Sequence, residues 1–241
     1  IFGKHCQTYP MVPRTKLLGE TVVISVDGNK MSHTSVDDLY CRTYGKKTLA
    51  YWRKRGEHTQ EAQNHVQWDV AANARNALLP GLYRWHAKYV SGHLPTSQLQ
   101  FKRQHQDHAE CPRCNESPET QAHVLRCNAP SATSKWTEGM NTLQVCLSKE
   151  VTHPGLATAI LSILSLWRKG DAIQVSLLPG GPRVRQAAHL QQTLLGWDSF
   201  VRGQWHWAWQ ELQAKYLQSI QSRKTGKRWA TAIIRQFFLI A

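Results

Sequence analysis

Four side chains that can bind a metal ion lie within one short stretch of the chain, CPRCNESPETQAHVLRC, which runs from Cys111 to Cys127. Two residues separate Cys111 from Cys114, and this gap lets a tight turn direct both sulfur atoms at one ion. His123 and Cys127 are four residues apart, so on a helix they would share a face. The spacing therefore predicts one tetrahedral site with three sulfur ligands and one nitrogen ligand.

The residues between the two ligand pairs predict how the second pair is held. Ser117 and Pro118 are typical of a helix start, with Ser117 as the N-cap and Pro118 in the first helical position. Because the protein fills all four ligand positions, such a site is closed and structural, with no position for a catalytic water. We expect Zn²⁺ as the cofactor, and we expect this zinc knuckle (residues 111–127) to depend on it for folding.

Two alternatives to this ligand set remain open at the level of sequence. A Cys-x-x-Cys pair can form a disulfide, although this needs an oxidoreductase context or an oxidising compartment, and six cysteines in 241 residues are too sparse for a disulfide-framed scaffold. His105 and His108 lie just upstream and are possible substitute ligands, but their spacing is less favourable. We therefore interpret the stretch as a metal site rather than a disulfide.

The rest of the chain has the hydrophobic periodicity of helices. From Ser35 onward, apolar residues recur at intervals of three and four. The pattern predicts a mainly α fold: a multi-helix domain with a small N-terminal β-hairpin and the embedded zinc knuckle. The predicted helices span residues 35–53, 68–78, 81–91, 118–127, 131–147, 155–168, 184–195, 198–221 and 226–240.

Turn-forming residues predict the hairpin and the boundaries between regions. TVVISVDGNKM places Asp27-Gly28, which favours a type I′ turn, inside a β-branched run. KRGEHTQEAQNH is almost without apolar residues, and Pro179-Gly180-Gly181-Pro182 cannot continue a helix. We therefore expect three regions. These are an irregular lead-in with the hairpin and first helix (1–60), a helical region that contains the knuckle (61–170), and a C-terminal helical region (183–241).

Net charge indicates the kind of partner. Thirty Lys and Arg residues against sixteen Asp and Glu residues give a formal charge of +14, which favours a polyanionic partner, above all DNA or RNA. A membrane is the rival partner, but the longest apolar run, LATAILSILSLW, is shorter than the ~18 residues of a spanning helix. The N-terminus lacks signal-peptide features, so we expect a piece of a longer, intracellular protein, nuclear or cytoplasmic, whose targeting signals lie elsewhere.

Basic residues gather in two places that suit phosphate contacts. SRKTGKRWATAIIR contains Trp229 within the first cluster, for which packing in the core is the favoured role. Trp205 and Trp209 would share a helix face, and packing is again favoured over base stacking. The predicted nucleic-acid contacts are Lys102, Arg103, Arg113, Arg126 and Lys135 around the knuckle, and Arg223, Lys224, Lys227 and Arg228 near the C-terminus.

The knuckle also carries a family resemblance. CPRCNESPETQAHVLRCNAP, followed by Trp136, resembles the zinc-binding segment that follows the reverse transcriptase and ribonuclease H domains of retroelement polyproteins. Here three residues separate His123 from Cys127, where many members have four. HVQWDVAANARNALLPGLYRWHAKYVSGHLPT and LLGWDSFVRGQWHWAWQELQAKYLQSIQSRKTGKRWATAIIRQ are similar to the flanks, so the likeness covers about residues 60–241.

This resemblance implies a zinc-stabilised, non-catalytic region that binds nucleic acid and contacts other domains of a parent polyprotein, itself an RNA-directed DNA polymerase. A structural protein of a ribonucleoprotein or another large assembly is the alternative. A nuclease is a third reading, but it needs several converging carboxylates. After Glu138 only Glu150, Asp171, Asp198 and Glu211 remain, and they are widely separated.

Overall fold

The computed structural model describes residues 24–26, 29–31, 50 and 59–240, and the chain divides into two compact units, Ile1–Arg55 and Gly56–Ala241. In the first unit, strand β1 (Ile24–Val26) pairs antiparallel with β2 (Asn29–Met31). The predicted turn at Asp27-Gly28, and the predicted helix at 35–53 apart from Ala50, lie outside the described residues.

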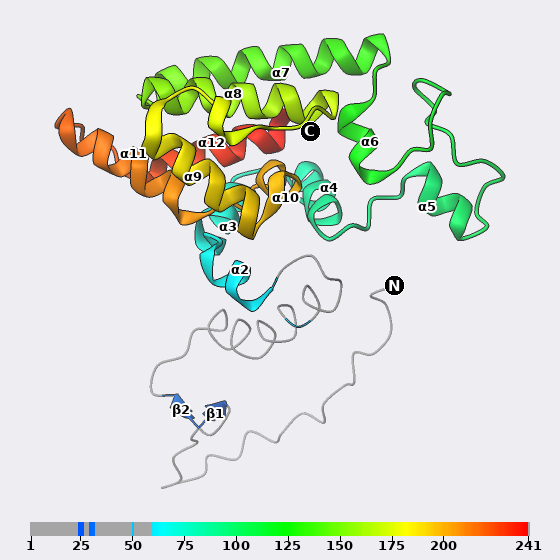
Figure 1. Ribbon diagram of the computed structural model, residues 1–241. Helices are drawn as coiled ribbons and strands as arrows, with labels where there is room; N and C mark the ends of the chain where they lie inside the picture. Colours follow the sequence, from blue (N-terminus) through cyan, green and yellow to red (C-terminus); the bar gives the residue numbers. More distant parts are fainter. Residues whose placement is uncertain (1–23, 27–28, 32–49, 51–58, 241) are drawn as a thin grey trace, which may run out of the picture. The chain divides into compact units, whose positions relative to one another are not determined.

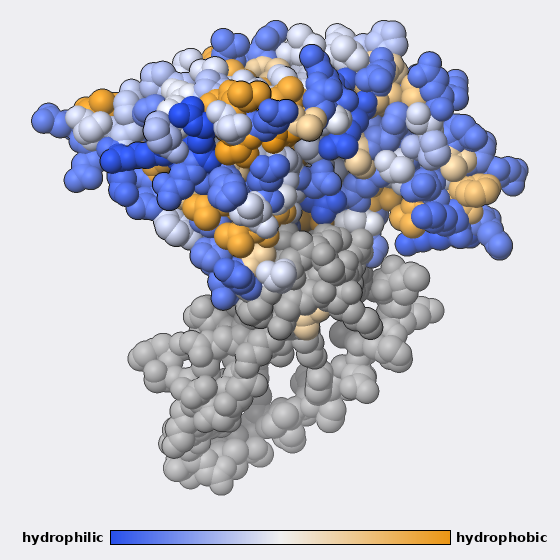
Figure 2. Space-filling view, in the orientation of Figure 1, coloured by the Kyte–Doolittle hydropathy of each residue, from blue (hydrophilic) through white to orange (hydrophobic). Residues whose placement is uncertain are grey.

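The second unit is built from helices, which confirms the mainly α prediction (Figure 1). None of the helices described is long and apolar enough to cross a membrane. Of the residues coloured in Figure 2, most are hydrophilic, and the apolar ones lie in separate patches. The elements are α2 (Gln60–His65), α3 (Trp68–Asn76), α4 (Pro80–Val90), α5 (Ser97–Lys102), α6 (Gln121–Arg126), α7 (Pro130–Lys149), α8 (Pro154–Lys169), η1 (Val175–Leu177), α9 (Gly181–Leu194), α10 (Gly196–Val201), α11 (Trp207–Ser219) and α12 (Gly226–Ile240).

Helix α12 lies at the centre of this unit and packs against α3, α7 and α11. Its residues Trp229, Ala230, Ile233, Ile234, Phe237 and Phe238 recur at helical spacing and are buried. Trp229 is fully buried, and its Nε1 donates a hydrogen bond to Thr152 Oγ1 at 2.8 Å. This confirms the predicted core role of Trp229 and removes its indole from any surface that a ligand could reach.

The single helix that the sequence predicts over residues 198–221 is wrong. The helix is interrupted between α10 and α11, where Gly203 has a left-handed φ of 78°. Gly203 also lies so close to the Phe238 ring that a Cβ added to it would be 2.6 Å from the ring. Gln191 satisfies the backbone at the break: its Oε1 accepts from the His206 amide at 2.8 Å and its Nε2 donates to the Gln204 carbonyl at 3.2 Å. Trp205 therefore precedes α11 instead of sharing a helix with Trp209, although both are buried.

Two of the predicted boundaries fall in structured parts of the unit. The polar stretch before Val66 contains α2, which begins at the cap Thr59. At Pro179–Pro182, the Gly180 backbone lies against Gly155 at the start of α8, and a Cβ on Gly155 would come within 2.4 Å of Gly180. One core cluster takes buried residues from both sides of this loop, from Val70 to Phe238. The loop therefore joins two helices of one unit.

Candidate metal centre

A short loop places the first two cysteines. Glu110 and Pro118 form an isolated antiparallel bridge, and the Cys111 amide donates to the Ser117 carbonyl at 2.8 Å. Inside this bridge, the Asn115 amide donates to the Cys111 carbonyl at 2.8 Å, and Asn115 has a left-handed φ of 56°. Asn tolerates this conformation better than most residues. The resulting tight turn brings Cys111 and Cys114 to one side of the loop.

Helix α6 places the other two ligands, but it starts later than the sequence predicts. Its N-cap is Thr120, whose Oγ1 accepts from the His123 amide at 3.0 Å, and not Ser117. Ser117 and Pro118 are committed to the loop instead, because the Ser117 carbonyl accepts from Cys111. Cys127 is the C-cap residue and lies just beyond the last helical turn. The predicted start at residue 118 is therefore wrong by three residues, whereas the predicted end, Cys127, is one residue past the last helical residue, Arg126.

The four predicted ligands nevertheless meet. Their ligand atoms all lie within 4.8 Å of one another, with Cys111 Sγ 3.8 Å from Cys127 Sγ and Cys114 Sγ 3.4 Å from His123 Nε2. Two sulfur ligands of one tetrahedral zinc ion lie about 3.8 Å apart, and a sulfur and a nitrogen ligand about 3.5 Å, whereas disulfide sulfurs lie about 2.0 Å apart. The cysteines are unbonded thiols at metal-site spacing. The group can hold a metal ion.

The environment of the sulfur atoms differs between the two buried cysteines. Burial acts to raise the pKa of Cys111, but hydrogen bonds from the backbone amides of Arg113 and Cys114 and from the side chains of Arg113 and His123 together lower it to about 6. Burial raises the pKa of Cys127. Cys111 and Cys127 are fully buried, while Cys114 and His123 are half-buried. One side of the site thus faces the protein and the other lies nearer to solvent.

We define the ligand segment as residues 109–127 and the helical body as the other described residues of the second unit. Arg168, near the end of α8, connects the two. Its guanidinium donates to the Leu125 carbonyl, to the Cys127 carbonyl at 3.0 Å, and to Thr133 Oγ1 at 3.2 Å. It also lies over the Trp136 ring, 4.9 Å from the centroid. Arg168 therefore binds the backbone at the last ligand and holds it against α7 and α8.

A second arginine reinforces this joint. Arg126 lies over the Trp167 ring at 4.3 Å from the centroid, and its Nη2 is 3.5 Å from Asp198 Oδ1. Trp167 Nε1 donates to the same carboxylate oxygen at 2.7 Å. Arg126 was predicted to contact nucleic acid. In the structure it packs on α8 and pairs with α10, although the side chain is still about one third exposed.

The other predicted contacts around the knuckle remain on the surface. Arg113 is exposed, and its Nη2 donates to the Val124 carbonyl at 2.7 Å, which braces the loop against α6. Lys135 is exposed and pairs with Glu138 at 2.8 Å. Lys102 and Arg103 are exposed at the end of α5.

The C-terminal basic residues divide into two kinds. Lys224 donates to Glu150 at 3.0 Å, and Lys227 lies 2.5 Å from Asp69. Arg223 and Arg228 are exposed, and neither guanidinium pairs with a carboxylate of the described residues. This set lies at the start of α12, whereas the residues of the ligand segment lie near the other end of that helix. The structure therefore separates the two predicted clusters.

His105 and His108 do not join the ligand group. His105 Nδ1 hydrogen-bonds to Gln100 Oε1 at 3.0 Å, and His108 Nδ1 is 3.5 Å from Glu110. Within the described part of the chain, the Cys–His group is the one set of three or more His, Cys, Asp or Glu side chains close enough to share an ion. The ligand set that the spacing predicts needs no substitute.

Two contributors to the site are missing from the sequence prediction. Glu119 Oε2 accepts from the amide of Ser97, at 2.9 Å, and so ties the ligand segment to the start of α5. Arg168 is the second contributor. The sequence indicates its role only through its position, directly after Trp167 at the end of an apolar helix. Comparison of the chain with known protein families, with curated proteins and with solved structures finds no match.

Proposed function

We propose that this chain is a non-catalytic, zinc-stabilised region that binds nucleic acid. The observation that supports the zinc part is the convergence of Cys111, Cys114, His123 and Cys127, whose ligand atoms all lie within 4.8 Å of one another. Three sulfur ligands and one imidazole are a set that zinc prefers, and four protein ligands make a closed, structural site. When bound, the ion would supply a cross-link between the loop and the end of α6.

The nucleic-acid part is supported by charge. The chain carries +14, and among the described residues Lys102 and Arg103 at the end of α5 and Arg223 and Arg228 at the start of α12 are exposed. Basic side chains displace the counterions of a phosphate backbone, and this gives affinity without sequence selectivity. Arg223 and Arg228 are the clearest candidates, because Lys224 and Lys227 already pair with carboxylates. We further propose a retroelement-derived polyprotein as the parent, on the strength of the knuckle resemblance.

Fluorescence anisotropy with labelled single-stranded DNA and RNA, at a series of salt concentrations, tests this proposal. Affinity should fall with salt by roughly 0.7–0.9 logarithmic units per neutralised phosphate for each tenfold rise in salt. Replacing Arg223 and Arg228 with Ala should reduce this salt dependence by the amount that corresponds to about one to two phosphate contacts. Replacing Lys224 and Lys227 with Ala removes the same charge from ion-paired residues, so the slope should change less.

The same samples, analysed for metal, keep the two parts of the proposal apart. Both double variants should retain one zinc per chain, because neither pair contacts the ligand segment. Equal binding and equal slopes for the parent and the Arg variant would show that these arginines form only a solvated face. A parent protein that binds neither strand at low salt would refute the nucleic-acid function while leaving the metal site standing.

A further inference from the structure

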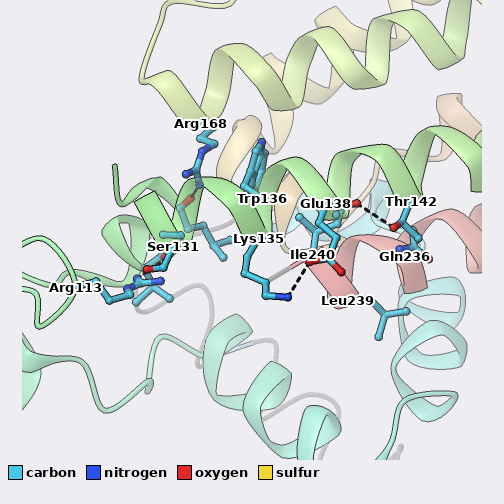
Figure 3. A pocket seen from close by; sticks show the side chains of 14 residues that line it. Arg113, Ser131, Lys135, Trp136, Glu138, Thr142, Arg168, Gln236, Leu239 and Ile240 are labelled. Atoms are coloured by element: carbon cyan, nitrogen blue, oxygen red, sulfur yellow. Dashed lines mark hydrogen bonds and ion pairs between the residues drawn. The ribbon is translucent and has the colours of Figure 1, made fainter. Parts of the chain in front are cut away.

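A groove of about 620 Å³ lies beside the ligand segment, between α7 and the last turn of α12 (Figure 3). Its volume falls within the roughly 300–1,000 Å³ that is usual for small-ligand sites. The ligand segment contributes Arg113 to the wall, α8 contributes Arg168, and α12 contributes Leu239 and Ile240. The groove is thus formed where the metal-organised part of the chain meets the helices.

One end of the groove is cationic. Figure 3 shows Arg113 and Ser131 together at this end, while Lys135 lies between them and Ile240 and points its ammonium toward Glu138. Arg113 donates to the Val124 carbonyl and to the Cys111 sulfur, and the remaining donors of its guanidinium can serve a ligand. The Lys135 side chain is 79% exposed, so its pairing with Glu138 is weak and exchangeable. The groove is therefore lined by three cationic side chains, Arg113, Lys135 and Arg168, and by one carboxylate, Glu138. This charge balance favours an anionic group of a ligand.

The other end of the groove is apolar with polar edges. Leu239, 46% exposed, and Ile240 lie at this end, and the side chains of Thr142 and Gln236 border it (Figure 3). Gly139 allows Ile240 to approach α7, because a Cβ on this glycine would lie 2.9 Å from the Ile240 side chain. A flat apolar group could lie against the two aliphatic side chains, while amide and hydroxyl groups hydrogen-bond its edge.

We propose that this groove holds one nucleotide of a single-stranded nucleic acid, with a phosphate at the cationic end and the base against Leu239 and Ile240. The inference rests on the proposed function and deepens it by naming the form of the ligand. A nucleotide is anionic at one end and flat, apolar and hydrogen-bonding at the other, which matches the two ends of the groove. In a duplex both faces of a base are covered by stacking, so a duplex cannot supply this base.

The test is a pair of bulky substitutions on α7. Thr142→Trp fills the apolar end, while Thr137→Trp is the matched control. Both threonines are exposed, and each hydroxyl donates to the carbonyl four residues earlier at 2.9 Å, but Thr137 does not line the groove. Thr142→Trp should weaken the binding of short single-stranded DNA and RNA at least about fivefold, the loss expected for one stacked base, whereas duplex binding should not change. Thr137→Trp should match the parent.

A second pair tests the cationic end with two variants that change the net charge of the parent by the same amount. Lys135→Glu and Lys215→Glu both remove an exposed lysine that pairs with a carboxylate on its own helix, and only Lys135 lines the groove. Lys135→Glu should weaken single-strand binding by about tenfold and lower the salt slope by about one, and Lys215→Glu should do less. If the parent binds single strands but the two variants of each pair lose the same affinity, the proposal that the groove holds a nucleotide is refuted, while the proposed function stands. A parent that binds no single strand would overturn the proposed function and the groove together.

Discussion

The ligand segment and the helical body are held together by different means. The ligand segment consists of a tight loop and one short helix that bring four candidate ligands together, and two of these, Cys111 and Cys127, are buried in a small cluster with Ala129, just beyond the segment. The helical body is held by a shared apolar core that takes residues from α3 to α12. Local spacing specifies the first region, whereas the second depends on packing between distant parts of the chain.

The joint between the two regions shows what this difference requires. Too little apolar surface is available in the ligand segment for extensive packing, so Arg168 and Arg126 make the connection with hydrogen bonds and by stacking on Trp136 and Trp167. Leu125 is the ligand-segment residue that is fully buried in the main core. Polar contacts to backbone carbonyls can position a segment that hydrophobic burial alone would leave loosely held.

The largest expected effect is the loss of a ligand. Cys127→Ser should reduce the zinc content from one per chain to near zero and unfold the ligand segment, because zinc contributes about 10–16 kcal/mol in comparable small sites. The helical body should keep most of its helix, since its core does not include the cluster. Metal analysis and far-ultraviolet circular dichroism measure the two effects.

Cys146→Ser is the control for this prediction. Cys146 is a half-buried thiol on α7 and is not part of the ligand group. The variant should retain its zinc. Full zinc content in Cys127→Ser, or a collapse of total helix content in that variant, would contradict the separation between the two regions.

A truncation in the core should have the converse effect. Ile163 is fully buried in α8, so Ile163→Ala should lower the free energy of unfolding by about 2–5 kcal/mol. Zinc should stay bound under native conditions, because no ligand changes. Chemical denaturation is the measurement, and Leu177→Ala, at a side chain that is 76% exposed, should change the unfolding free energy by less than about 0.5 kcal/mol.

A change at the joint should affect both regions, though less. Arg168→Met removes the hydrogen bonds to the Leu125 and Cys127 carbonyls and should weaken zinc binding by about 10–100-fold, the usual effect of losing a partner outside the ligand set. Titration against a competing chelator measures this loss. Lys169→Met, at the next and exposed position, should bind zinc as the parent does; if both variants match the parent, the joint does not support the site.

The smallest effect concerns pH and the helical body alone. Burial, with a further contribution from the Arg75 charge, lowers the pKa of His86 to about 4, and its ring packs on Phe238. The unfolded chain, with a His pKa near 6.5, therefore binds more protons between pH 4 and 6.5, and stability falls as the pH falls through this window. At pH 5.5 the loss from this group should be about 1.4 kcal/mol relative to pH 7.5.

His86→Leu should remove that share of the pH dependence. Acid also protonates the Cys and His side chains of the candidate metal site, so the informative quantity is the difference in unfolding free energy between the parent and the variant at each pH. This difference should change by about 1.4 kcal/mol from pH 7.5 to 5.5. A constant difference would show that His86 does not titrate as its burial implies.

How well the sequence predicts a feature of this fold depends on how far apart along the chain the interacting residues lie. The four ligands and the helical periodicity of α7, α8 and α12 are local patterns, and the structure agrees with them. The break at Gly203 is not local, because it depends on Phe238, which comes from another helix. The N-cap of α6 is Thr120 and not the predicted Ser117, because the Ser117 carbonyl accepts a hydrogen bond from Cys111 and closes the loop that holds the first two cysteines. Spacing alone does not reveal such competing demands.

The position of α12 affects the order in which the molecule can assemble. The end of α3 at Asn76 and the start of α12 at Gly226 are about 150 residues apart, yet the two helices pack together. A ribosome delivers about 5–20 residues per second, so α3 waits many seconds for this partner, while all four ligands leave the exit tunnel close together. Cys111, Cys114, His123 and Cys127 can therefore capture zinc before the helical core closes. Until α12 has been synthesised, the side of α3 that α12 covers stays exposed on the nascent chain.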